Sequence, residues 1–158
     1  MTKAEGNDLP EPLAPPPIIF LICLALGVVL EFVFPYPLIP YSVAQFSIGI
    51  ALIAAGSTLI GWSMIAISKA ETTYDPRGVP TALVTSGPYQ YSRNPGYLGL
   101  ATIQIGIAAT VDSPAIFLMT IPAILITSYI VINREEAKLE REFGHQYVEY
   151  KGSVRRWI

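Results

Sequence analysis

Four long apolar runs limit what this chain can fold into more than any other feature. They cover residues 18–34, 42–67, 97–111 and 114–132, and Glu31 is the only charged residue in them. A helix crosses the hydrocarbon core of a bilayer with roughly 20 apolar residues, so the first two runs and the last have spanning length and the third is short for a span. We expect an all-α fold, an integral membrane bundle of about four transmembrane helices with a cytosolic helical extension at its C-terminal end.

Charge is distributed as unevenly as hydrophobicity. Hydrophobic residues make up 52% of the chain and charged residues 14%. With four spans, every lysine and arginine lies on the side shared by the N-terminus, the loop after the second run and the C-terminal segment. The positive-inside rule therefore places both termini in the cytosol. The small net charge of −2 and the absence of a basic stacking surface argue against a nucleic-acid partner.

The ends of the chain are expected to differ from the bundle. Residues 1–17 are polar and proline-rich, and we expect a disordered lead-in there, followed by one membrane domain over residues 18–158. The fourth run becomes charged after Ile132 without a helix breaker before Gly144, which predicts one helix that leaves the membrane and stops at that glycine. The tail beyond it, 145–158, mixes aromatic and basic residues and is expected to lie on the membrane surface.

Two polar clusters carry the candidate chemistry. The first, residues 85–97, combines turn formers, tyrosines and Arg93 immediately before the third run, and the second is Glu135 with Glu136 at the exit of the fourth. A hairpin of the third and fourth runs would bring the clusters to the same membrane level. An interfacial loop with tyrosine and arginine anchors would also explain the first cluster alone. The adjacent carboxylates near the membrane boundary instead favour a cationic ligand.

The ordered combination of these motifs resembles the isoprenylcysteine carboxyl methyltransferase and phospholipid methyltransferase superfamily. The residues that carry the resemblance are Leu83-Val84-Thr85-Ser86-Gly87-Pro88-Tyr89, Arg93-Asn94-Pro95-Gly96-Tyr97, Glu135-Glu136, and Phe143-Gly144 with Tyr147 and Tyr150. They cover roughly the C-terminal half of the chain. The first two runs match that superfamily in character only.

The resemblance implies a membrane methyltransferase that uses S-adenosylmethionine at the cytosolic face and methylates a lipid-like or prenylated acceptor. It implies Arg93 and Glu135 as catalytic residues, with Arg93 near the incoming substrate. The cofactor-binding residues that it implies are Leu83, Val84, Tyr89, Asn94, Pro95, Gly96, Tyr97, Glu135 and Glu136. The chain also lacks the Gly-x-Gly-x-x-Gly turn after a strand that nucleotide-binding sheets use.

Two positions depart from the family pattern. Asn94 stands where the family has a histidine, so any role there is limited to hydrogen bonding. Val131 stands one helical turn before the glutamates, where the isoprenylcysteine branch has an arginine, which favours an amine or another headgroup over a carboxylate acceptor. Because the chain has one histidine and one cysteine, far apart, we expect no metal site.

A non-catalytic scaffold or small transporter component is the alternative from another class. Transporters more often carry polar residues at mid-membrane, and here the spans hold few of them: Gln45, Thr58 and Gln104. The expected partners are a lipid-like substrate and membrane lipids. The small residues of the second run allow close helix packing, either within one chain or across a homo-oligomer: Gly49, Ala51, Ala55, Gly56 and Gly61.

Overall fold

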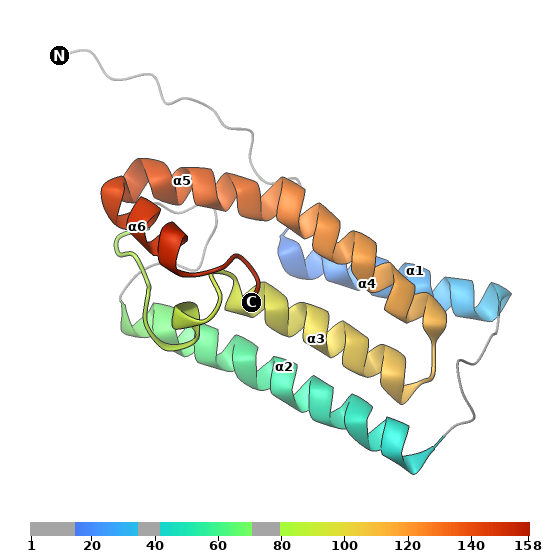
Figure 1. Ribbon diagram of the computed structural model, residues 1–158. Helices are drawn as coiled ribbons and strands as arrows, with labels where there is room; N and C mark the ends of the chain where they lie inside the picture. The colour runs from blue at the N-terminus through green and yellow to red at the C-terminus, as the bar shows by residue number, and fades with distance from the viewer. Residues whose placement is uncertain (1–14, 35–41, 71–79) are drawn as a thin grey trace.

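The computed structural model describes residues 15–34, 42–70 and 80–158, and this part of the chain is helical without a strand (Figure 1). Its elements are α1 (Pro16–Val33), α2 (Val43–Lys69), the 3-10 helix η1 (Gly87–Gln90), α3 (Pro95–Thr110), α4 (Pro114–Ile126), the π-helix η2 (Thr127–Ile132), α5 (Asn133–Phe143) and α6 (His145–Ser153). The expected all-α bundle is confirmed. Residues 1–14 of the lead-in expected at 1–17 lie outside the described residues. The expected end of the lead-in at position 17 is wrong, because Pro16 and Pro17 form the first turn of α1.

Local sequence signals set the helix ends. The Ser42 hydroxyl accepts from the backbone N–H of Gln45 at the start of α2, and the Ser113 hydroxyl accepts from Ile116 at the start of α4. Such side-chain caps satisfy N–H groups that the first helical turn leaves unpaired. Gly144 ends α5 with a φ of 52°, a conformation that glycine adopts without steric cost. The predicted helix stop at Gly144 is therefore confirmed.

Helices α2 and α3 run antiparallel in close backbone contact (Figure 1). Gly49 and Gly56 on α2 meet Gly106 and Gly99 on α3, where an added Cβ on any of them would lie within 2.8 Å of the opposing glycine's carbonyl oxygen. Small residues at such positions let membrane helices approach closely. The expected close packing of the second run is thus confirmed for these two glycines. Its other small residues lie elsewhere: Ala51 and Ala55 are exposed, and Gly61 has open space around its Cβ position.

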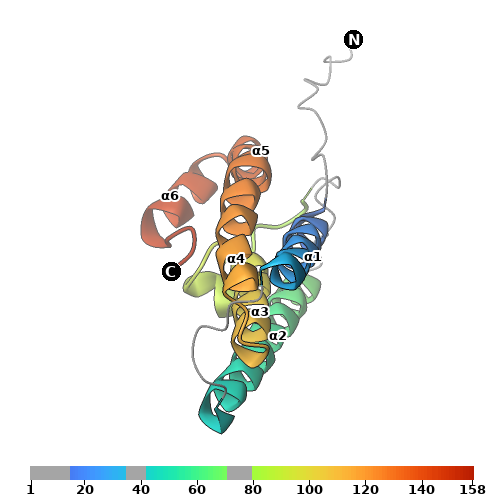
Figure 2. The same cartoon turned by 90° about the vertical axis from the view of Figure 1, so that its right-hand side faces the viewer.

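The fourth apolar run continues as one helix into the charged segment after Ile132, as predicted. α4, η2 and α5 form one 30-residue helix, Pro114–Phe143, which crosses α3 and packs along α1 (Figure 2). The π-helix in its middle was not predicted. Wide turns of this kind occur inside α-helices, frequently at functional sites. The long helix carries Glu135 and Glu136 beyond the apolar stretch that ends at Ile132.

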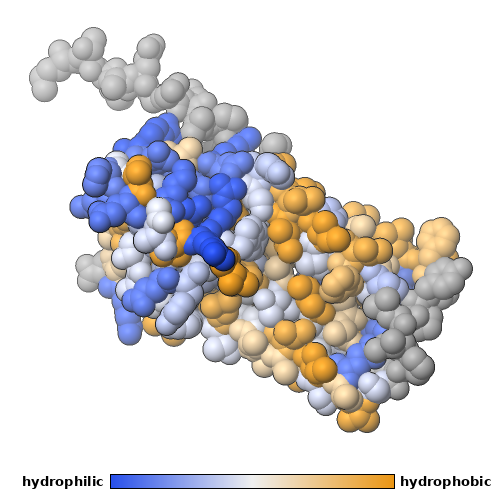
Figure 3. Space-filling model, viewed as in Figure 1, coloured by the Kyte–Doolittle hydropathy of each residue, from blue (hydrophilic) through white to orange (hydrophobic). Residues whose placement is uncertain are grey.

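The surface of the bundle is apolar over most of its length. In the part of the chain that the structure describes, three helices are long and apolar enough to cross a membrane: Pro16–Val33, Val43–Lys69 and the apolar part of Pro114–Phe143. At most a third of each apolar window is buried inside the protein, so the remaining side chains need a lipid environment. Figure 3 shows hydrophilic residues gathered at the end formed by α5 and α6, whereas hydrophobic residues cover most of the helical body. The shorter helix α3 stays a predicted fourth span.

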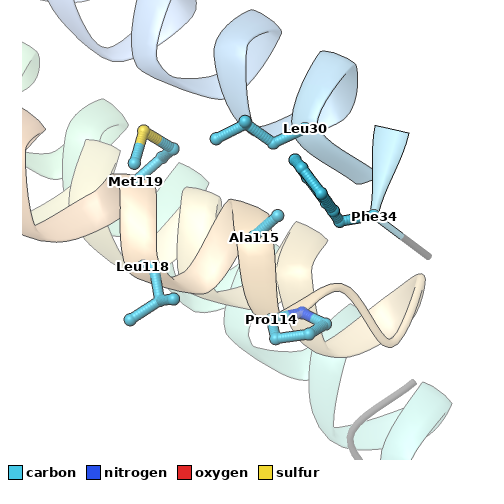
Figure 4. Close-up of a pocket in the computed structure, with 6 residues that line it drawn as sticks. All are labelled: Leu30, Phe34, Pro114, Ala115, Leu118 and Met119. Atoms are coloured by element: carbon cyan, nitrogen blue, oxygen red, sulfur yellow. The ribbon is translucent and has the colours of Figure 1, made fainter. Parts of the chain in front are cut away.

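An apolar cavity lies at the opposite end of the bundle from these charged helices. Its volume is about 300 Å³, and it lies between the end of α1 and the start of α4 (Figure 4). The lining residues are Leu30, Phe34, Pro114, Ala115, Leu118 and Met119. No ionisable side chain lines it, so it offers a surface for hydrocarbon and no group for catalysis.

Candidate functional site

An arginine, glutamate and arginine triad joins the start of α3, the start of α5 and the C-terminal tail. Glu136 accepts from Arg93 Nη2 at 2.9 Å on one oxygen and from Arg156 Nη2 at 2.7 Å on the other, and Arg156 Nε adds a 3.1 Å contact. The Glu136 and Arg93 side chains are only 7% and 9% exposed. Since charged hydrogen bonds strengthen away from water, this triad fixes three segments that are distant in sequence.

Backbone hydrogen bonds hold the tail over the start of α3. The Arg93 N–H donates to the Arg155 carbonyl at 3.0 Å, and Asn94 Nδ2 donates to the Arg156 carbonyl at 2.9 Å. Arg93 Nη1 also donates to the Lys151 carbonyl at the end of α6. The Asn94 side chain therefore acts as a hydrogen-bond donor, in agreement with the expectation that an amide at this position is limited to hydrogen bonding.

Glu135 has an environment different from that of its neighbour Glu136. Its Oε1 accepts from the Tyr97 hydroxyl at 2.6 Å, and among the described residues no arginine pairs with it as Arg93 and Arg156 pair with Glu136. Burial raises the pKa of Glu135 to about 7, while the Tyr97 hydrogen bond and the positive charge of Lys138 lower it. A carboxylate in this setting favours a cationic ligand that would stabilise its ionised form.

Two buried tyrosines from α6, Tyr147 and Tyr150, pack beside the cluster. Tyr150 donates its hydroxyl to the Tyr89 carbonyl at 2.7 Å, and its ring lies against that of Tyr147. Burial raises the pKa of Tyr150 to about 12, so this hydroxyl keeps its proton and stays a donor at neutral pH. The η1 segment, which contains Tyr89, packs on the end of α2, where Gly87 lies close to Trp62.

The structure brings most of the sequence-predicted site residues to one end of the bundle. The predicted convergence of the two polar clusters is confirmed, since Arg93 contacts Glu136 and Tyr97 contacts Glu135. Asn94, Pro95, Gly96 and Tyr97 are buried at the start of α3. Leu83 and Val84 are half-buried in the segment before η1 and outside the hydrogen-bonded cluster described above. Their cofactor contacts, like those of the other residues, stay predictions.

The tail contributes residues that the sequence did not assign to the site. Arg156 pairs with Glu136, and Trp157 packs on the core cluster that contains Ile19, Tyr97 and Val131. The expectation that the tail lies on the membrane surface is wrong for its tyrosines, because Tyr147 and Tyr150 are buried in the protein. The alternation of aromatic and basic residues in the tail is compatible with packing on the site, but it is equally typical of a membrane interface.

Comparison with known proteins identifies relatives of this chain. The sequence model of the phospholipid methyltransferase family matches residues 44–146. This match includes Arg93, Tyr97 and both glutamates, and it ends before Arg156. An uncharacterized protein of Haemophilus influenzae is 37% identical over 62 residues, which are 39% of this chain and 98% of that protein. The family match therefore covers helices α2 to α5 and leaves out α1 and the end of the tail.

Proposed function

Because the chain belongs to the phospholipid methyltransferase family, we propose that this membrane methyltransferase uses S-adenosylmethionine to methylate a lipid-like acceptor. The observation that carries the proposal is the pairing of Glu135 with Tyr97 beside the arginine triad, at the end of an apolar bundle. A half-buried carboxylate and an aromatic ring are suited to a cation, and an apolar bundle is suited to a lipid tail. A non-catalytic scaffold or transporter component remains the competing proposal.

The described residues fit the cofactor by their chemistry. S-adenosylmethionine supplies a methyl group on a positively charged sulfonium and carries an ammonium and a ribose. Glu135 would bind one of these cationic or hydroxyl groups, and the ring of Tyr97 would add a cation–π contact. Leu83, Val84, Tyr89 and the 94–96 segment would form the surrounding wall. The triad would hold Glu136 and Arg93 in place, with Arg93 at the side where the acceptor enters.

The acceptor is proposed to present an amine or another lipid headgroup. Val131 is buried among Ile19, Tyr97 and Ile132, so this position gives an acceptor carboxylate no cationic partner. An amine must lose its proton before it can attack, and both Glu136 oxygens already bind arginines. Glu135, which pairs with no arginine among the described residues, is then the suitable proton acceptor of the two.

We place this site on the cytosolic side of a four-span topology, with α3 as the fourth span. The 16 residues of α3 rise about 24 Å, somewhat less than a hydrocarbon core of about 30 Å. Its position between α2 and α4 supports this placement, because both neighbours run the length of the bundle. The distribution of lysines and arginines supports the cytosolic orientation of both termini.

Cofactor binding by detergent-purified protein tests the proposal. Titration calorimetry with S-adenosylmethionine should show saturable binding, and Glu135→Gln should weaken it by about 10-fold or more because a charged hydrogen bond is lost. Glu142→Gln makes the same chemical change at an exposed position of α5 and should bind normally. Folded wild-type protein that binds no cofactor would favour the non-catalytic alternative.

Binding should also release protons below neutral pH. Since burial raises the pKa of Glu135 to about 7, this carboxyl is largely protonated at about pH 6, and a bound cation favours its ionised form. Affinity should therefore fall as the pH drops below about 7. Calorimetry at about pH 6 in buffers of different ionisation enthalpy measures the release. The Glu142→Gln protein should release the same number of protons as wild type, and an undiminished release in saturated Glu135→Gln would refute the assignment to this carboxyl.

A further inference from the structure

The buried face of the 30-residue helix Pro114–Phe143 changes its spacing within η2. Before η2, buried residues recur every three or four positions, as on one face of an α-helix: Ile116, Thr120, Ala123 and Thr127. Glu136, which is 5% exposed, follows Thr127 by nine residues. In a regular α-helix nine residues make about two and a half turns, so Glu136 would point away from the face that carries Thr127. The contact of Glu136 with Arg93 therefore needs a break in the α-helical register.

The wide turn of η2 supplies this break. The Asn133 N–H donates to the Ser128 carbonyl five residues earlier, where an α-helix would use the carbonyl four residues earlier. A turn with one more residue shifts everything after it by about 100° relative to a regular helix. Glu135 then continues the face of Thr127, and Glu136 lies on the flank of that face. Both carboxylates thereby reach partners at the start of α3.

Two side chains fit the wide turn. Tyr129 is 70% exposed, so the additional residue widens the helix at its outer surface and takes no space in the core. Because the Asn133 N–H bonds to Ser128, the Tyr129 carbonyl loses the N–H that an α-helix would give it. The side-chain amide of Asn133 donates to this carbonyl instead, at 3.4 Å. The Asn133 side chain therefore supports the wide turn.

We propose that η2 is a positioning element of the candidate site, because its additional residue sets the rotation of α5 at which both glutamates reach the start of α3. As a regular α-helix, the same sequence would turn Arg134 toward the inner face, since Arg134 follows Thr127 by seven residues, about two full turns. A positive charge at this place would repel Arg93 and a cationic cofactor. The effect of η2 on cofactor binding rests on the proposed function, whereas its effect on the pair of Glu136 with Arg93 does not.

Deleting Tyr129 tests this role, because the deletion removes one residue from the wide turn. Thr127 would then precede Glu136 by eight residues, and a regular α-helix would bring both glutamates to the places that they hold now. Tyr129→Ala removes the same side chain and keeps the residue count, so it is the matched control. In titration calorimetry, the two proteins should bind S-adenosylmethionine with affinities within about threefold of each other. The deletion protein should melt at the same temperature as the control or higher.

Inserting an alanine after Tyr129 makes the opposite change. The insertion turns α5 by about a further 100° and brings Arg134 to the place of Glu135. Affinity for S-adenosylmethionine should then fall by about 10-fold or more relative to wild type, and the melting temperature should fall as well. Unchanged affinity in the insertion protein would contradict the positioning role of η2.

Melting temperatures test the same role without the cofactor. Glu136→Ala should lower the melting temperature by the same amount in the Tyr129 deletion and in Tyr129→Ala, because both proteins keep Glu136 within reach of Arg93. A deletion protein that melts clearly below the control, or in which Glu136→Ala has no effect, overturns the role of η2. If wild-type protein binds no cofactor while these melting temperatures come out as expected, the proposed function fails and the positioning role stands.

Discussion

Replacing Glu136 by alanine is expected to destabilise the folded protein by about 3 kcal/mol, a loss typical of breaking a buried ion pair. The change leaves Arg93, which is 9% exposed, without its carboxylate partner, while Arg156 is 33% exposed and can turn toward water. It also removes the contacts between Glu136 and the Arg156 side chain, which weakens the attachment of the tail to the start of α5. Thermal unfolding in detergent measures the loss.

The control for this change is Glu140→Ala. Glu140 pairs with Lys151 at 3.2 Å, but both side chains are at least 40% exposed, and such pairs contribute about 0–1 kcal/mol. A double variant, Arg93→Met with Glu136→Met, should recover much of the lost stability because it removes both buried charges. Equal, small losses in Glu136→Ala and Glu140→Ala would show that the triad does not hold the tail.

The helical framework could be predicted because its signals are local. Ser42, Ser113 and Gly144 mark helix ends through contacts with residues one turn away, and each lies where the structure begins or ends a helix. The convergence of Arg93 with the glutamates could be predicted because the third and fourth apolar runs form a helical hairpin. The end of such a hairpin lies at the same height in the bundle as its beginning. The π-helix at η2 has no comparable local signal and was missed.

The closing of the site by the tail could not be predicted because it depends on long-range contacts. Arg156 reaches Asn94 across 62 positions of the sequence, and nothing in the composition of the tail distinguishes this packing from contact with lipid headgroups. The different partners of Glu135 and Glu136 were not predicted. Adjacent helical residues point about 100° apart, so one carboxylate faces Tyr97 and the other faces the arginines.

Replacing Gly99 by leucine is expected to separate α2 from α3 and to cost about 3 kcal/mol or more in stability. A Cβ at this position would lie 2.6 Å from Ile60 Cγ1 and 2.7 Å from the Gly56 carbonyl oxygen. The isoleucine side chain can move, but the backbone carbonyl moves only if the whole of α2 moves. Because Gly99 lies one turn after Pro95 and two residues after Tyr97, the displacement should also reduce cofactor affinity, measured by calorimetry beside the melting temperature.

Gly61→Leu makes the same substitution on α2 with no atom within 4 Å of the new Cβ, so stability should change by no more than about 0.5 kcal/mol. This contrast separates tight helix contact from the general effect of a leucine in place of a glycine. If both variants kept wild-type stability, α2 and α3 would not be in backbone contact. Contacts other than the glycine packing with α2 would then have to hold the start of α3 in position. Loss of stability in Gly61→Leu alone would instead identify a contact on the outer face of α2, which a second copy of the chain could supply.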